Sequence, residues 1–246
     1  SKIDDIDFTI LENPNYNYGN QIYNFYYFYK VNKFILGTQQ ISTIPGFREV
    51  THILHMASIA SPTFYRKYPI ETIDANVWGL RNLLDTYQNS NSLKGFVFFS
   101  SSEIYGDPDQ NNIPTKETFR GLVSCTGPRA CYDEAKRFGE TLCVVYRENF
   151  NMPISVVRPF NNYGPGMKIT DKRLPADLAN CIKNNKDIIL FSNGSPTRTF
   201  CYVTDAIIGY LKVLTSSHYS EFNIGFDSNE ISVFELAKYY REIGIE

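Results

Sequence analysis

Two side chains with acid–base chemistry, Tyr132 and Lys136, lie four residues apart in a segment whose pattern predicts a helix. Residues at this spacing share one face of a helix, one turn from each other. An ammonium beside a tyrosine stabilises the phenolate and lowers the tyrosine pKa from about 10 towards neutral pH, where a general base works best. The hydroxyl of Ser101 can share the proton that moves. Together these residues predict a site that removes the proton of a substrate hydroxyl during its oxidation.

Three hydroxyl residues, Ser100, Ser101 and Ser102, end a short apolar run that begins at Leu93. Such a run is typical of a buried parallel strand. Because reactive groups in open α/β sheets lie beyond the carboxyl ends of the strands, this position suits a catalytic hydroxyl. A tyrosine and a lysine at this spacing also occur by chance on helices, so the strand context is what favours catalysis over ordinary packing.

Apolar runs and helical patterns alternate along the chain. Strands are predicted at residues 8–11, 34–36, 53–56, 95–100 and 154–157, and helices at 69–88 and 132–149. Further along, the pattern predicts a helix at 175–184, a strand at 188–191 and a helix at 205–214. Residues 13–29, crowded with Asn and Tyr, are predicted as a divergent loop and surface helix. This order predicts an α/β fold with a doubly wound parallel sheet.

The composition argues against several classes of protein. A formal net charge of -2 over 246 residues offers no basic surface for nucleic acid. No apolar run approaches the roughly 20 residues that cross a bilayer. The cysteines have an odd count and no paired metal-ligand spacing, so neither a disulfide framework nor a metal site is expected. They are Cys125, Cys131, Cys143, Cys181 and Cys201.

The segment Gly127-Pro-Arg-Ala-Cys-Tyr-Asp-Glu-Ala-Lys-Arg137 closely resembles the active-site helix of the UDP-glucuronic acid decarboxylases, or UDP-xylose synthases. That family belongs to the extended short-chain dehydrogenase/reductases, the NAD-dependent epimerase/dehydratase branch that acts on nucleotide sugars. Four other segments are similar to the same family: residues 55–62, 100–108, 158–165 and 197–203. The resemblance runs from about Asp7 to about Ala237.

The resemblance implies a Rossmann-like fold with NAD as cofactor and a nucleotide sugar as substrate. We expect an NAD-binding domain at residues 1–159. A smaller substrate-binding lobe, with returns to the core sheet, is expected at residues 160–246.

The resemblance also implies roles for individual residues. The catalytic set is Tyr132, Lys136, Ser101 and Glu103. The cofactor-binding set is Glu12, Ala57, Ser58, Asn76, Ser100, Tyr132, Lys136 and Pro159, with Glu12 on the adenosine ribose. The substrate-binding set is Ser102, Asn161, Arg173, Arg198 and Tyr202. The two guanidinium groups suit a diphosphate or a carboxylate through their planar fork of donors.

The reaction that the resemblance favours is oxidation of UDP-glucuronate at C4, followed by decarboxylation to UDP-xylose. The 4-ketone lies β to the C6 carboxylate, so carbon dioxide can leave. Glu103 keeps other reactions open, because in dehydrating relatives such a residue removes the C5 proton. Ser102 argues against the dTDP-glucose 4,6-dehydratases, which carry Asp there, but GDP-mannose 4,6-dehydratases also carry Ser. A 4-epimerase and a catalytically impaired nucleotide-sugar-binding homologue stay open as alternatives.

Both ends of the chain depart from the family pattern. Relatives open with a Gly-x-x-Gly-x-x-Gly turn that holds the cofactor pyrophosphate at a helix N-terminus, and this sequence has no such run. We therefore expect the first β-α unit, roughly 30 residues, to be missing from the chain, and a substrate-side segment to be missing after Glu246. A chain without that turn is expected to bind NAD weakly.

A homodimer is expected, because relatives pair through the helix that carries Tyr132 and the helix before it. The apolar residues of these helices exceed what one face needs, although core burial explains them equally well. They are Leu80, Leu83, Leu84, Leu142, Val145 and Tyr146. The expected location is cytoplasmic.

Overall fold

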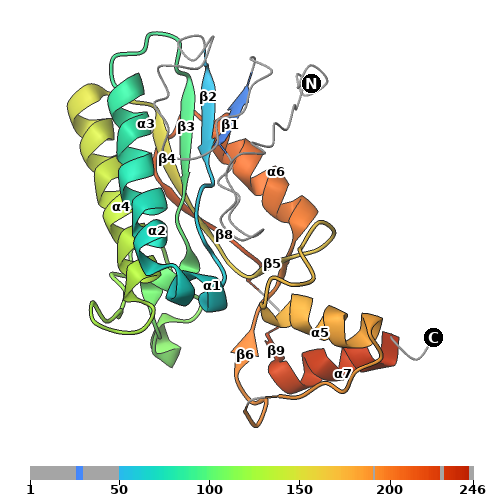
Figure 1. Ribbon diagram of the computed structural model, residues 1–246. Coiled ribbons are helices and arrows are strands. Elements are labelled where there is room, and N and C mark those ends of the chain that lie inside the picture. Colours follow the sequence, from blue (N-terminus) through green and yellow to red (C-terminus); the bar gives the residue numbers. More distant parts are fainter. Residues whose placement is uncertain (1–25, 30–49, 191, 228–229, 244–246) are drawn as a thin grey trace.

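The computed structural model describes residues 26–29, 50–190, 192–227 and 230–243. Glu12 and the strands predicted at 8–11 and 34–36 lie outside the described residues. In the described part, β-strands form a central sheet, helices cover both of its faces, and a smaller lobe lies at one end (Figure 1).

The central sheet has five strands in the order β1-β2-β3-β4-β8. Their bounds are β1 Tyr26–Tyr29, β2 His52–His55, β3 Gly95–Phe99, β4 Ile154–Pro159 and β8 Glu221–Ile224. Strands β2, β3, β4 and β8 are mutually parallel. The sequence predicts a parallel sheet and the first three of these strands, whereas β8 was not predicted. The parallel arrangement requires crossover connections, and helices supply them.

The edge strand β1 corrects the prediction for residues 13–29. Residues 26–29 pair antiparallel with β2, where a loop and surface helix were expected. Their sequence, Tyr-Tyr-Phe-Tyr, consists of aromatic residues that favour strands. The density of Asn and Tyr around this run concealed that local preference.

One face of the sheet is covered by helices from two parts of the chain (Figure 1). They are α1 Pro62–Lys67, α2 Pro69–Ile73, the π-helical segment η3 Asp74–Trp78, α3 Gly79–Tyr87 and α4 Ala130–Phe150. The helix predicted at 69–88 is therefore α2, η3 and α3 in succession. The opposite face is covered by α6 Val203–Leu214, which packs against Val97, Phe99 and Val157.

The apolar residues expected at a dimer interface are mostly core residues. Leu80, Leu83 and Leu84 are fully buried, and Tyr146 is buried with them in the core between the sheet and the helices. Leu142 is partly buried against that core, and only Val145 is exposed. Core burial, which the sequence left open, is the correct explanation for the four buried residues.

The smaller lobe contains two helices and two short strand pairs. The helices are α5 Leu174–Lys183 and α7 Val233–Ile243, and the strands are β5 Asn162–Tyr163, β6 Thr197–Arg198, β7 Cys201–Tyr202 and β9 Ile231–Ser232. Strand β5 pairs with β7, and β6 with β9. The helices predicted at 175–184 and 205–214 are confirmed as α5 and α6.

The strand predicted at 188–191 is wrong for the residues that the structure describes there. Residues 188–190 form no strand, and Ile189 is 72% exposed. A short apolar run needs a neighbouring strand to form a ladder, and none of the described strands pairs with it. Across the described ranges, no helix combines the length and the hydropathy required to cross a bilayer.

Candidate active site

The end of β3 leads directly into the predicted serine cluster. Ser101 is the N-cap of the 3-10 helix η4, Ser102–Tyr105, and its Oγ accepts a hydrogen bond from the backbone N–H of Glu103 at 3.2 Å. Such a cap fixes the backbone at the start of a helix. The predicted residues Ser101, Ser102 and Glu103 are therefore held in one short turn beyond the carboxyl end of the strand.

Tyr132 and Lys136 lie in the first two turns of α4, and both are buried. The Lys136 Nζ lies 5.7 Å from the centre of the Tyr132 ring and 5.1 Å from that of Phe98. It donates a hydrogen bond of 2.5 Å to the backbone carbonyl of Phe99, at the end of β3. This bond joins the helix that carries the tyrosine to the strand that leads to Ser101.

The pKa of Tyr132 is shifted in the opposite direction to the one that the sequence predicts. Burial raises its pKa above the ordinary value, although the side-chain hydrogen bond with Ser101 and the charge of Arg173 act in the opposite direction. Lys136 was expected to lower this pKa. Its own pKa, however, is lowered to about 7 by burial, which weakens its charge near neutral pH. The predicted lowering of the Tyr132 pKa is therefore wrong.

Tyr65, on α1, is a site residue that the sequence analysis missed. Its ring stacks on that of Tyr132, with 5.0 Å between the ring centres and 12° between the planes. The Cys131 thiol donates to the backbone carbonyl of Tyr65 at 3.5 Å, which joins α1 to the start of α4. No spacing in the sequence connects residues so far apart, so only the fold reveals this contact.

Arg129, also missed, connects Glu103 to α4. Its Nη2 donates a hydrogen bond to Glu103 Oε2, and its Nε lies 3.5 Å from Asp133 Oδ2. The Glu103 side chain is 41% exposed, so this carboxylate lies at the boundary of the buried site. Burial raises the pKa of Asp133, and Arg129 opposes that rise. Arg129 thus sets the direction of the Glu103 carboxylate.

The predicted cofactor residues come from the carboxyl ends of β2 and β4 and from the helical segment η3. Ala57 is fully buried just after β2, and Pro159 ends β4. Asn76 is also fully buried and donates from Nδ2 to the backbone carbonyl of Thr72 at 2.7 Å. Among the described residues, the buried Ser58 Oγ and Asn76 Oδ1 have no hydrogen-bond partner. Buried polar atoms normally have partners, so these residues fit a polar ligand such as NAD.

His55, at the end of β2, lies close to the same site. It is fully buried against Phe98, with 5.6 Å between the ring centres. Burial, with a further effect from Lys136, lowers its pKa to about 3. His55 is therefore neutral at physiological pH and adds no charge near Lys136.

Of the predicted substrate residues in the small lobe, Arg173 lies close to Tyr132. Arg173 is the N-cap residue of α5, is paired with Asp171, and lies near enough to Tyr132 to affect its pKa. Asn161 and Tyr202 belong to the small lobe, where Asn161 Nδ2 donates to the backbone carbonyl of Thr199 at 3.0 Å.

Arg198 lies on β6 and is exposed, and its Nη1 donates 2.7 Å to the backbone carbonyl of Thr197. Among the described contacts, none joins Arg198 to Tyr132 or Ser101. The residues that the structure describes contain no group of three His, Cys, Asp or Glu side chains that could hold a metal ion.

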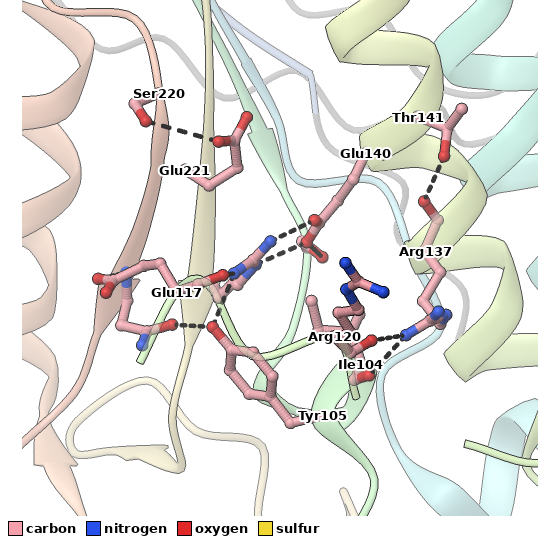
Figure 2. A network of polar contacts seen from close by, with 12 residues as sticks. Ile104, Tyr105, Glu117, Arg120, Arg137, Glu140, Thr141, Ser220 and Glu221 are labelled. Carbon is pink, nitrogen blue, oxygen red and sulfur yellow. Dashed lines mark hydrogen bonds and ion pairs between the residues drawn. The ribbon is translucent and has the colours of Figure 1, made fainter. Parts of the chain in front are cut away.

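A network of polar contacts joins Glu140 on α4 to residues of the central sheet (Figure 2). Arg158, on β4, donates from Nε and Nη2 to the two carboxylate oxygens of Glu140, at 2.9 and 2.6 Å. Ser100 Oγ donates to the same carboxylate at 2.5 Å. The sequence analysis assigned Ser100 to the cofactor side but missed Glu140 and Arg158.

Comparison with known proteins adds the family context. Residues 31–225 match the "NAD dependent epimerase/dehydratase family". UDP-glucuronic acid decarboxylase 4 of Arabidopsis thaliana is 36% identical over 198 residues, which are 80% of this chain and 44% of that protein. UDP-glucuronic acid decarboxylase 1 of Xenopus tropicalis is 34% identical over 81% of this chain and 46% of its own length. The chain thus spans about half the length of these curated relatives.

Solved structures share the fold. UDP-glucose 4-epimerase from Thermotoga maritima matches with a TM-score of 0.70 at 24% identity, covering 78% of this chain and 60% of that one. UDP-glucuronic acid 4-epimerase from Bacillus cereus, solved with UDP-glucuronic acid and NAD, matches with a TM-score of 0.59 at 26% identity, covering 72% and 53%. These matches confirm the predicted Rossmann-like fold.

Proposed function

Because the chain belongs to the NAD dependent epimerase/dehydratase family, we propose that it modifies a nucleotide sugar with NAD, by oxidation at C4 and decarboxylation of UDP-glucuronate to UDP-xylose. The resemblance inferred from the motifs is confirmed, and the predicted cofactor agrees with the family's description. The observation that carries the proposal is the buried contact of Ser101, Tyr132 and Lys136, with Glu103 held beside them by Arg129.

Each residue has a defined task in this proposal. Tyr132 takes the proton of the C4 hydroxyl, and Ser101 shares it through their hydrogen bond. Lys136, in its charged form, stabilises the phenolate form of Tyr132 against the burial that raises the tyrosine pKa. Ala57, Ser58, Asn76 and Pro159 would hold NAD, which would supply the hydride chemistry at C4.

Carbon dioxide can leave once C4 is a ketone, because the bonding electrons of the C5–C6 bond flow into the carbonyl. The C5 atom must then gain a proton, and Glu103, oriented by Arg129, would deliver it. Arg173 and Arg198 suit the diphosphate or the carboxylate, and Ser102, Asn161 and Tyr202 offer hydrogen-bonding groups to the sugar nucleotide.

A second candidate is epimerisation or dehydration of the same class of substrate. The relative from Bacillus cereus is named for 4-epimerisation of UDP-glucuronic acid, and decarboxylation shares its oxidation at C4. A catalytically impaired binding homologue is the third candidate. Such a protein would have no need of the Ser101–Tyr132–Lys136 contact, and its presence argues for an enzyme.

Mass spectrometry distinguishes these candidates. The full-length protein is incubated with NAD and, in separate reactions, with UDP-glucuronate, UDP-glucose or GDP-mannose. We expect UDP-glucuronate to lose about 44 Da, the mass of carbon dioxide. Loss of water from either of the other sugars, with UDP-glucuronate unchanged, would assign the protein to the dehydratases. A product of unchanged mass that separates from its substrate by liquid chromatography before the mass spectrometer would indicate an epimerase, and unchanged substrates throughout would indicate the binding homologue.

We further propose a homodimer that pairs through the outer surface of α4 and the preceding helical segment. Trp78, Phe138 and Val145 are 60%, 51% and 43% exposed there. A contiguous exposed apolar patch often marks an interface, and these three side chains lie on the helices through which the resemblance implies pairing. The predicted cytoplasmic location and the division into domains at residue 160 also stay predictions.

Phe138→Glu is expected to convert the dimer to a monomer, because the carboxylate would be buried without a partner. Size-exclusion chromatography with light scattering measures the mass. Phe234→Glu is the matched control, since Phe234 is an equally exposed aromatic residue on α7 of the small lobe. A folded wild-type protein that runs as a monomer contradicts the proposal.

A further inference from the structure

Glu140 lies one helical turn beyond Lys136 on α4, and its side chain is only 12% exposed. Its carboxylate accepts three hydrogen bonds from two other elements: one from Ser100 after β3 and two from Arg158 on β4. Two of these bonds form a bidentate, charge-assisted pair with the Arg158 guanidinium. Residues 100–105, which follow β3, are called the serine turn below. Glu140 therefore fixes the start of the serine turn against α4.

Arg158 extends this network to the far side of the site. Its Nη1 donates to the hydroxyl of Tyr105 at 2.7 Å and to the backbone carbonyl of Glu117 at 2.8 Å. The Tyr105 hydroxyl in turn donates to Asn223 Oδ1, on β8, at 2.7 Å. Tyr105 is the last residue of η4, the turn that carries Glu103 (Figure 2). The Glu140–Arg158 ion pair thus connects α4 to β4, to β8 and to both ends of the serine turn.

Lys136 faces groups from three elements. His55 comes from β2, the carbonyl of Phe99 from β3, and Tyr132, Glu140 and Cys143 from α4 itself. His55 is neutral, and burial raises the pKa of the Cys143 thiol well above its ordinary value, so that this thiol is also neutral. Among these described groups, Glu140 is the one that forms an ion pair, with Arg158.

We propose that Glu140 is a positioning residue of this site: with Arg158 it fixes the serine turn against α4 and holds the Lys136 ammonium in its charged form beside Tyr132. The inference rests on the proposed function in taking Tyr132 and Lys136 as the catalytic pair. Arg158 moderates the effect, because its guanidinium neutralises part of the charge of Glu140.

The sign of each effect follows from the charges. Burial lowers the pKa of Lys136 to about 7, and Glu140 opposes that fall. Removing the charge of Glu140 should therefore lower this pKa further. Removing Arg158 leaves the carboxylate unopposed and should raise it. A purely structural ion pair would change stability in both variants and leave the Lys136 pKa where it is.

The test is NMR titration of the Lys136 side chain in the full-length protein labelled at lysine, with Lys136→Met to assign the signal. Glu140→Gln should lower the Lys136 pKa by roughly one pH unit or more, and Arg158→Met should raise it. Arg81→Met is the matched control, since the Arg81–Asp85 pair is exposed on α3.

A double variant and a separate measurement of turnover complete the test. If either single variant does not fold, Glu140→Gln/Arg158→Met removes both buried charges together and should still lower the Lys136 pKa. An unchanged Lys136 pKa in every folded variant overturns the inference. Turnover of the nucleotide sugars is measured separately, so a protein that decarboxylates UDP-glucuronate without these pKa shifts disproves only the role of Glu140. Shifts without turnover would instead contradict the proposed function.

Discussion

Replacement of Tyr132 by Phe in the full-length protein is expected to lower turnover by at least about 100-fold, with nearly unchanged binding of the nucleotide sugar. The variant keeps the ring that stacks on Tyr65 and loses only the hydroxyl that is hydrogen-bonded to Ser101. Because the ring is buried and packed, the fold should be preserved. Steady-state kinetics with the accepted substrate give kcat and KM, and calorimetry gives the affinity.

Tyr146→Phe is the matched control for this experiment. It removes another buried tyrosine hydroxyl from the same helix, one that donates to Asp85 on α3, away from the serine turn. Turnover of this control should stay near the wild-type rate. A near wild-type rate from the Tyr132 variant would disprove the assignment of Tyr132 as the general base.

Replacement of Arg158 by Met is expected to destabilise the fold by about 3–5 kcal/mol, because the Glu140 carboxylate would remain buried without its cation. The side chains of the pair are 8% and 12% exposed, and the Tyr105 hydroxyl and the Glu117 carbonyl would also lose a donor. Chemical denaturation of the wild type and the variant at one pH measures the difference in the free energy of unfolding.

The exposed pair of Arg81 and Asp85 sets the comparison, since its side chains are 48% and 43% exposed. Arg81→Met should cost much less stability than Arg158→Met, because an exposed ion pair is screened by water. The double variant Glu140→Gln/Arg158→Met should recover part of the loss, because no charge is left buried alone. Equal losses from Arg158→Met and Arg81→Met would show that the buried network contributes little to stability.

Features that depend on neighbours in the sequence were predictable. The strands near 53–56, 95–100 and 154–157 follow from short apolar runs, and the structure has β2, β3 and β4 there. The position of Ser101 after β3 follows from the run that precedes it. The exposed run at 188–190 and the pairing of β1 were not predictable in this way, because a strand exists only where another strand pairs with it.

The sequence by itself determined that Tyr132 and Lys136 share a helix face, since helical periodicity is a local property of the chain. It also determined the family, through motifs that are contiguous in sequence. Only the tertiary structure decided that Tyr65 stacks on Tyr132, that Arg129 holds Glu103, and that Glu140 pairs with Arg158. These contacts join elements that are distant in sequence, and their distances are set by how helices pack on the sheet.

The tertiary structure also decided the protonation of the site. Spacing alone predicted a lowered pKa for Tyr132, whereas burial raises it and lowers that of Lys136. The reason is that the free energy of a charge depends on every group around it and on its distance from water, and both are properties of the folded chain.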